Sequence, residues 1–128
     1  MGTRVQEMTQ GLPKEMLPIQ GRPMISYAIQ EAALCHIEEL YIIINEHKAI
    51  LRRFLESADL AKAIQSDLQG PPVTLPSLTF IDQPVPRGSG EAIFRARELI
   101  GEGPFALMMP DFVFFGRVPC LAQMIPLY

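Results

Sequence analysis

The sequence predicts an α/β fold with three layers, in which a parallel sheet lies between helices. Short apolar runs of strand length alternate along the chain with segments of helical periodicity. Strands that are separated by helices pair in parallel through crossover connections. The chain has 128 residues and a hydrophobic content of 48%, enough for one hydrophobic core and too little for two. We therefore expect one globular unit or part of one.

Three segments have the apolar spacing of helices. Residues 23–33 place apolar side chains three and four positions apart, and Pro23 suits a first helical turn. Residues 47–65 continue the same spacing, with charged residues between the apolar ones. Residues 90–100 form the third segment, and Gly101 is positioned to end it.

Three short apolar runs predict strands, over residues 40–44, 78–82 and 105–109. The first is a continuous run rich in isoleucine, which is typical of a strand that is buried on both faces. A proline-rich stretch, residues 69–77, predicts a loop between the second helix and the second strand. The third strand is expected to stop at Pro110.

Composition excludes several classes of protein. A net charge of −3 gives no broad basic field, so neither nucleic acid nor an anionic membrane surface is an expected partner. The longest apolar runs fall far below the ~18 residues of a membrane span, and no apolar signal core is present. Cys35 and Cys120 lie far apart and form no CxxC pattern, which argues against a zinc site or a disulfide framework. We expect a cytoplasmic protein.

Ligands of parallel sheets bind beyond the carboxyl ends of the strands, so the residues after each expected strand are candidates. Residues 82–92, "DQPVPRGSGEA", leave the second strand and enter a helix. Gly88 lets this loop present backbone donors, and the Gln83 amide can pair with a base edge. A glycine-rich helix start is also an ordinary turn, and both the P-loop and the dinucleotide patterns are absent. Both interpretations stay open at this point.

Two further stretches carry candidate ligand-binding residues. Asp111 follows the third expected strand, where its carboxylate could hold Mg²⁺ against a phosphate or could simply begin a turn. At the start of the chain, Gly2, Thr3 and Arg4 are followed by Lys14. A glycine lets the backbone approach a phosphate, and the two cations would neutralise it. The same charges could equally be solvated surface residues.

In combination, these segments resemble the sugar-1-phosphate nucleotidyltransferase family. "GTR", then "PKEMLPI", then "RPMISYAI" keep the order of the family signature, GxGTR, PK and a proline that enters a helix. "QPVPRGSGEA" and "MPD" resemble its nucleotide-base loop and its metal loop, and "PCLAQMI" is also similar to the bacterial UTP:glucose-1-phosphate uridylyltransferases. The resemblance covers nearly the whole chain and implies a partial three-layer Rossmann-like nucleotidyltransferase sheet.

The resemblance assigns roles to the N-terminal candidates. Gly2 and Thr3 would lie in the loop that wraps the nucleoside triphosphate, and Arg4 would steady its β and γ phosphates. Lys14 would bind the phosphates near the α-phosphorus and stabilise charge there. Arg4 and Lys14 are therefore the expected catalytic residues.

It also assigns roles to the later candidates. Gln83 would contact the pyrimidine edge, with help from the backbone of Gly88, and Asp111 would hold Mg²⁺. The implied reaction is in-line attack of a sugar 1-phosphate oxygen on the α-phosphorus of UTP, which yields UDP-glucose and pyrophosphate. The implied ligands are thus UTP, glucose 1-phosphate and Mg²⁺.

The sequence departs from the family pattern in several places. The family has a hydrophobic first strand before the position of Gly2, and its sugar-binding residues and second metal aspartate would come after Tyr128. Glu7 and Gln10 replace a usual proline and lysine. We therefore interpret residues 1–128 as an incomplete N-terminal nucleotide-binding part of a nucleotidyltransferase domain, with poor activity alone and an open seam that favours homo-oligomers or aggregation. The alternative is a degenerate paralogue that acts only as a nucleotide-binding or partner-binding module.

Overall fold

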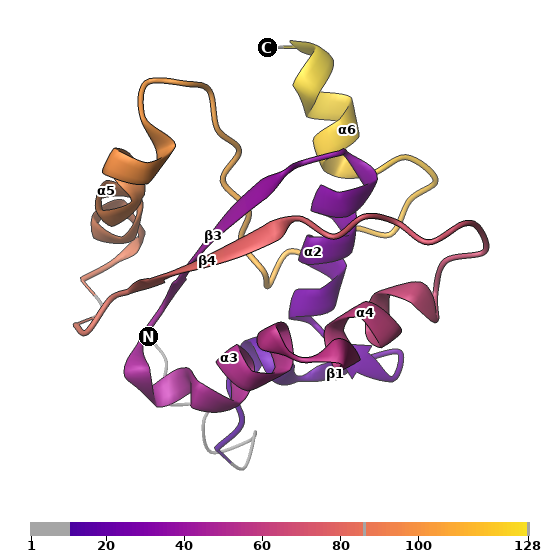
Figure 1. Cartoon of the computed structure of the whole chain (residues 1–128), viewed down its shortest axis with the longest axis horizontal. Coiled ribbons are helices and arrows are strands. Elements are labelled where there is room, and N and C mark those ends of the chain that lie inside the picture. Colours follow the sequence, from indigo (N-terminus) through magenta and orange to yellow (C-terminus); the bar gives the residue numbers. More distant parts are fainter. Residues whose placement is uncertain (1–10, 86, 128) are drawn as a thin grey trace.

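The computed structural model describes residues 11–85 and 87–127, in which helices and strands alternate as the α/β prediction requires (Figure 1). The strands form two separate two-stranded sheets. No helix in the described part of the chain is long and apolar enough to cross a membrane. In chain order the elements are η1 (Lys14–Met16), β1 (Pro18–Ile19), β2 (Arg22–Pro23), α2 (Ile25–Leu34), β3 (Glu39–Ile44), η2 (Glu46–Lys48), α3 (Ala49–Glu56), α4 (Ala58–Gln65), β4 (Ser77–Asp82), α5 (Ser89–Ile100), α6 (Cys120–Met124) and η3 (Ile125–Leu127).

The parallel pair β3 and β4 runs through the middle of the molecule (Figure 1). Its register extends from Glu39 opposite Ser77 to Ile44 opposite Asp82, which confirms the expected parallel pairing. The pairing continues for one further hydrogen bond, since the Gln83 N–H donates to the Ile44 carbonyl at 2.8 Å. The carboxyl ends of both strands therefore lie side by side.

The two faces of this pair are covered by different helices. The apolar even-numbered residues of both strands pack on a core from α2, α3 and α4, because successive side chains of a strand point to opposite faces. On the other face, α5 contacts β3, and Tyr41 Oη donates a hydrogen bond to the Leu99 carbonyl at 3.3 Å. The arrangement is thus three-layered, as predicted. The buried core cluster consists of Ile25, Ile29, Ile44, Leu51, Leu55, Leu60 and Ile64.

A short hairpin precedes the first α-helix and was not expected from the sequence. Strands β1 and β2 are antiparallel and are joined by Gln20 and Gly21, which have φ angles of 49° and 85°. Two successive left-handed residues are the requirement of a type I′ turn, and glycine adopts this conformation without steric cost. Pro23 therefore belongs to β2 and not to a first helical turn, and α2 begins at Ile25.

The expected single helix over residues 47–65 is wrong, because it is divided at Ser57. This residue is extended, with φ −96° and ψ 162°, and its hydroxyl accepts a hydrogen bond from the Asp59 N–H at 3.2 Å. A serine that caps the following turn competes with continuation of the preceding helix. The third expected helix is confirmed as α5, and Gly101 ends it with a φ of 69°.

The expected strand over residues 105–109 is also wrong within the described structure. A strand needs a neighbour that satisfies its backbone groups, and neither described sheet includes this segment. Its alternate side chains Phe105, Leu107 and Met109 are 56%, 56% and 44% exposed. In β3, similarly, only Ile44 is buried, so the expected burial of residues 40–44 on both faces is not found.

A buried ion pair attaches η1 to the segment that follows β3. The Glu15 side chain is only 7% exposed, and its Oε1 accepts from Lys48 Nζ at 2.8 Å. Its other oxygen, Oε2, is buried without a hydrogen-bond partner among the described residues. A carboxylate that has lost its water depends strongly on its remaining partner. Lys48 therefore fixes the position of η1.

We predict that Lys48→Met lowers the free energy of unfolding by about 2–3 kcal/mol, because it leaves the Glu15 charge buried and unpaired. Urea denaturation at neutral pH measures the change. Lys62→Met is the matched control, since Lys62 pairs with Asp59 on the exposed surface and should cost less than about 0.5 kcal/mol. Equal losses in the two variants would contradict this account of Glu15.

A second prediction tests the core. Ile29 is 2% exposed, and Ile29→Ala should lower the free energy of unfolding by about 2–4 kcal/mol through lost burial and a residual cavity. Ile50 is 51% exposed on the outer side of α3, so Ile50→Ala should change it by less than about 1 kcal/mol. The same urea titration compares both variants, and a larger effect at Ile50 would place the core incorrectly.

Candidate active site

Two predicted site residues from opposite ends of the chain meet directly. Lys14 begins η1, and Asp111 lies in the turn that follows residues 105–109. They are 97 positions apart, yet Lys14 Nζ lies 2.6 Å from Asp111 Oδ2. The side chains are 44% and 37% exposed, so both remain accessible to a ligand.

Local structure positions each member of this pair. Pro13 precedes η1, and its carbonyl accepts the Met16 N–H at 2.8 Å, which forms the turn that presents Lys14. The adjacent Glu15 is held by its ion pair with Lys48. On the other side, the Phe112 N–H donates to the Met109 carbonyl at 3.0 Å and closes the turn that contains Asp111.

The pair is an exposed ammonium beside an exposed carboxylate. The hydrogen bond from Lys14 holds the pKa of the Asp111 carboxyl below its usual range, so the group is ionised at neutral pH. A cation of this kind can bind phosphate oxygens, and an ionised carboxylate can bind a hard metal cation. The pair therefore has the chemistry to meet a phosphate and its counterion together.

The described residues supply only part of a Mg²⁺ site. Residues 11–85 and 87–127 contain no cluster of three histidine, cysteine, aspartate or glutamate side chains that could hold a metal by themselves. Mg²⁺ usually takes one or two carboxylates and fills its other positions with water and substrate phosphates. Asp111 alone fits a metal that arrives with a phosphate, and does not make a closed protein site.

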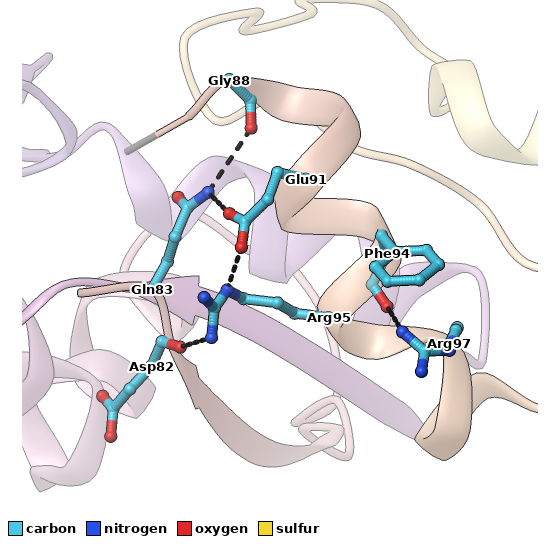
Figure 2. A network of polar contacts seen from close by, with 7 residues as sticks. All are labelled: Asp82, Gln83, Gly88, Glu91, Phe94, Arg95 and Arg97. Atoms are coloured by element: carbon cyan, nitrogen blue, oxygen red, sulfur yellow. Dashed lines mark hydrogen bonds and ion pairs between the residues drawn. The ribbon is translucent and has the colours of Figure 1, made fainter. Parts of the chain in front are cut away.

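A second group of polar contacts lies just after β4 (Figure 2). Gln83 follows the strand directly, and its Nε2 donates to the Gly88 carbonyl at 3.4 Å and to the Glu91 carboxylate. Gly88 precedes α5 with a φ of 99°, a conformation that is essentially restricted to glycine. The structure thus brings together the two residues that were predicted to contact the base.

Two residues of this network were missed in the sequence. Glu91 accepts from Gln83 and also from Arg95 Nε, and Arg95 Nη1 donates to the Asp82 carbonyl at 3.3 Å. Hydrogen bonds from Gln83 and then Arg95 lower the pKa of the Glu91 carboxyl. The available signal was a glutamate four positions before an arginine at the start of a helix, directly behind the glycine-rich loop.

The structure does not join all the predicted residues. In the part of the chain that is described, no hydrogen bond or ion pair connects Lys14 or Asp111 with Gln83 or Gly88. Gln83 and Gly88 follow the carboxyl end of β4, as expected for a ligand site of an α/β fold, whereas Asp111 follows residues 105–109, which form no strand in the described structure. The predicted residues Gly2, Thr3 and Arg4, and the replacements Glu7 and Gln10, lie outside the described residues.

Comparisons with known proteins identify relatives of this chain. The UTP–glucose-1-phosphate uridylyltransferase of Mycoplasma pneumoniae is 36% identical over 136 aligned residues. A second enzyme of that name from Staphylococcus saprophyticus is 33% identical over 139 residues. Each alignment covers 100% of this chain and 47% of the relative. The chain thus spans about half the length of the curated relatives it matches.

Solved structures give the same result. A UDP-glucose pyrophosphorylase in complex with UDP-glucose has a TM-score of 0.78 at 30% identity, over 99% of this chain and 49% of that chain. A UTP-bound enzyme of this kind from Acinetobacter baumannii has a TM-score of 0.80 at 28% identity, over 99% and 48%. The profile of the family described as nucleotidyl transferase matches residues 1–126. The chain therefore belongs to the nucleotidyl transferase family.

Proposed function

We propose that this chain carries the nucleotide-binding part of an enzyme that transfers a uridylyl group from UTP to glucose 1-phosphate. The observation that supports the proposal is the contact between Lys14 and Asp111. These residues are 97 positions apart in the sequence, and the fold brings a cation and an ionised carboxylate into contact. The relatives that the chain matches carry the name of this activity. The products would be UDP-glucose and pyrophosphate.

Lys14 would act on the triphosphate. Its Nζ would bind oxygens near the α-phosphorus and stabilise the charge that develops there during transfer. The half-exposed position of the side chain leaves room for this contact. Arg4 would steady the β and γ phosphates, and Gly2 and Thr3 would form the surrounding loop.

Asp111 would hold Mg²⁺ together with phosphate oxygens and water. A bound Mg²⁺ neutralises charge on the phosphates and aligns them. In the transfer, an oxygen of the sugar phosphate forms a bond to the α-phosphorus of UTP while the bond from that phosphorus to the pyrophosphate oxygen breaks. No covalent enzyme intermediate is needed.

Gln83 would contact the pyrimidine, and the backbone of Gly88 would lie beside it. Both residues follow β4 at the edge of the sheet where α/β folds bind nucleotides.

The exposed apolar side chains of residues 105–109 and of Phe112, which is 81% exposed, favour association with another apolar surface. We therefore also propose that the isolated chain self-associates, which light scattering on a sizing column measures.

Nucleotide binding has a direct test. UTP with Mg²⁺ should raise the melting temperature of the purified chain, and ATP with Mg²⁺ at the same concentration should not. At ten times the Kd, bound UTP adds about 1.4 kcal/mol to the free energy of unfolding. Asp111→Asn should remove the part that depends on Mg²⁺, whereas the surface variant Asp59→Asn should leave it unchanged. No response to UTP would refute the proposal.

Turnover requires a separate measurement. We expect the 128-residue chain to form little or no UDP-glucose from UTP and glucose 1-phosphate, because it spans about half of its relatives. Chromatographic detection of UDP-glucose, with Lys14→Ala as the negative control, measures this directly. Formation that Lys14→Ala abolishes would show that this part of the family fold suffices for catalysis.

A further inference from the structure

The side-chain amide of Gln83 is held in one orientation. Its Nε2 faces two acceptors, the Gly88 carbonyl at 3.4 Å and the Glu91 carboxylate. An ionised carboxylate and a carbonyl oxygen accept hydrogen bonds and cannot donate them. Rotation of the amide by half a turn would therefore bring its oxygen against two other oxygens. The NH₂ group must face Glu91.

This orientation determines what the rest of the amide can offer. Gln83 Oε1 lies on the side away from Glu91 (Figure 2), and no residue of the described chain donates a hydrogen bond to it. The half-buried side chain thus presents a free acceptor while its donors are occupied. A glutamine without this restraint would present either group.

Glu91 is in turn fixed to the end of the strand. Arg95 Nε donates to Glu91 Oε1, and Arg95 Nη1 donates to the Asp82 carbonyl at 3.3 Å. Since Gln83 follows Asp82 directly, the contacts run from the strand to α5 and back to the residue after the strand (Figure 2). Such closed networks hold their members more rigidly than single contacts do.

We propose that Glu91 is a positioning residue that sets base selectivity, by holding the Gln83 amide so that it offers the nucleobase an acceptor only. This inference rests on the proposed function. At the pairing edge, uracil presents the N3–H donor between two carbonyl oxygens, whereas cytosine presents an acceptor at N3. A fixed Oε1 opposite N3 can accept from the uracil N3–H and is repelled by the cytosine N3, and cytosine would have to shift before its 4-amino group could donate to this acceptor.

The test compares Glu91→Gln with Glu98→Gln. Glu98 lies on the same helix, is exposed and pairs only with Arg97 among the described contacts, at 3.3 Å. Dissociation constants for UTP and CTP, each with Mg²⁺, are measured by calorimetry. We expect the unchanged protein and Glu98→Gln to prefer UTP by about tenfold or more, and Glu91→Gln to lose most of that preference because the amide can then turn.

The ratio of the two constants separates positioning from structural support. A purely structural role of Glu91 would weaken UTP and CTP binding equally, and an unchanged ratio in Glu91→Gln would overturn the inference while the proposed function stands. Arg95→Gln provides a second variant that leaves Glu91 in place, and it should shift the ratio in the same direction by a smaller factor. No UTP binding by the unchanged protein would overturn both the proposed function and the inference.

A nucleotide-free measurement tests the restraint itself. The side-chain NH₂ protons of Gln83 should exchange slowly with water in ¹⁵N spectra of the unchanged protein and of Glu98→Gln, because the carboxylate of Glu91 holds them. They should exchange faster in Glu91→Gln. Equal exchange rates in all three proteins would show that Glu91 does not hold the amide and would overturn the inference.

Discussion

The parallel pairing of β3 with β4 is the constraint on which the core and the polar network both depend. Its register sets Ile44 beside Asp82, so the chain leaves both strands at one edge, and the Gln83 N–H extends the pairing by one bond. The same register puts the apolar even-numbered residues of both strands against α2, α3 and α4. A slip by one residue would turn these side chains away from the core and move Gln83 from its place beside α5. Stability and the placement of Gln83 are therefore linked through one set of backbone hydrogen bonds.

Much of this fold could be predicted from the sequence, because hydrophobic periodicity reports local structure well. The strands near residues 40–44 and 78–82 and the helix near 90–100 are confirmed within a residue or two. The break at Ser57 depends on a single hydroxyl that caps the next helix, which outweighs a continuous apolar spacing. Residues 105–109 have the composition of a strand, but strand formation requires a neighbouring strand, and composition carries no information about one.

The site shows the same division between local and long-range information. The resemblance identified Lys14 and Asp111 from short motifs, but no sequence pattern showed that they touch, because their contact depends on how η1 and the turn at Asp111 are placed in three dimensions. The attachment of η1 through Lys48 escaped notice for the same reason. Glu91, by contrast, could have been identified from the sequence, because its spacing of four residues to Arg95 is a local helical signal. Only the glycine-rich loop before it was considered from the sequence.

The two groups of site residues have opposite physical characters, which suit different tasks. The Gln83–Glu91–Arg95 network is closed on itself and returns to the backbone of β4, so its geometry is set before any ligand arrives. The Lys14–Asp111 pair is half exposed, and ion pairs in such positions contribute less than about 1 kcal/mol, so its separation costs little. In the proposed function, a triphosphate would take the ammonium of Lys14 and leave the carboxylate of Asp111 to a metal cation. The group proposed to recognise the base is therefore fixed, whereas the pair proposed to bind the phosphates can exchange its partners.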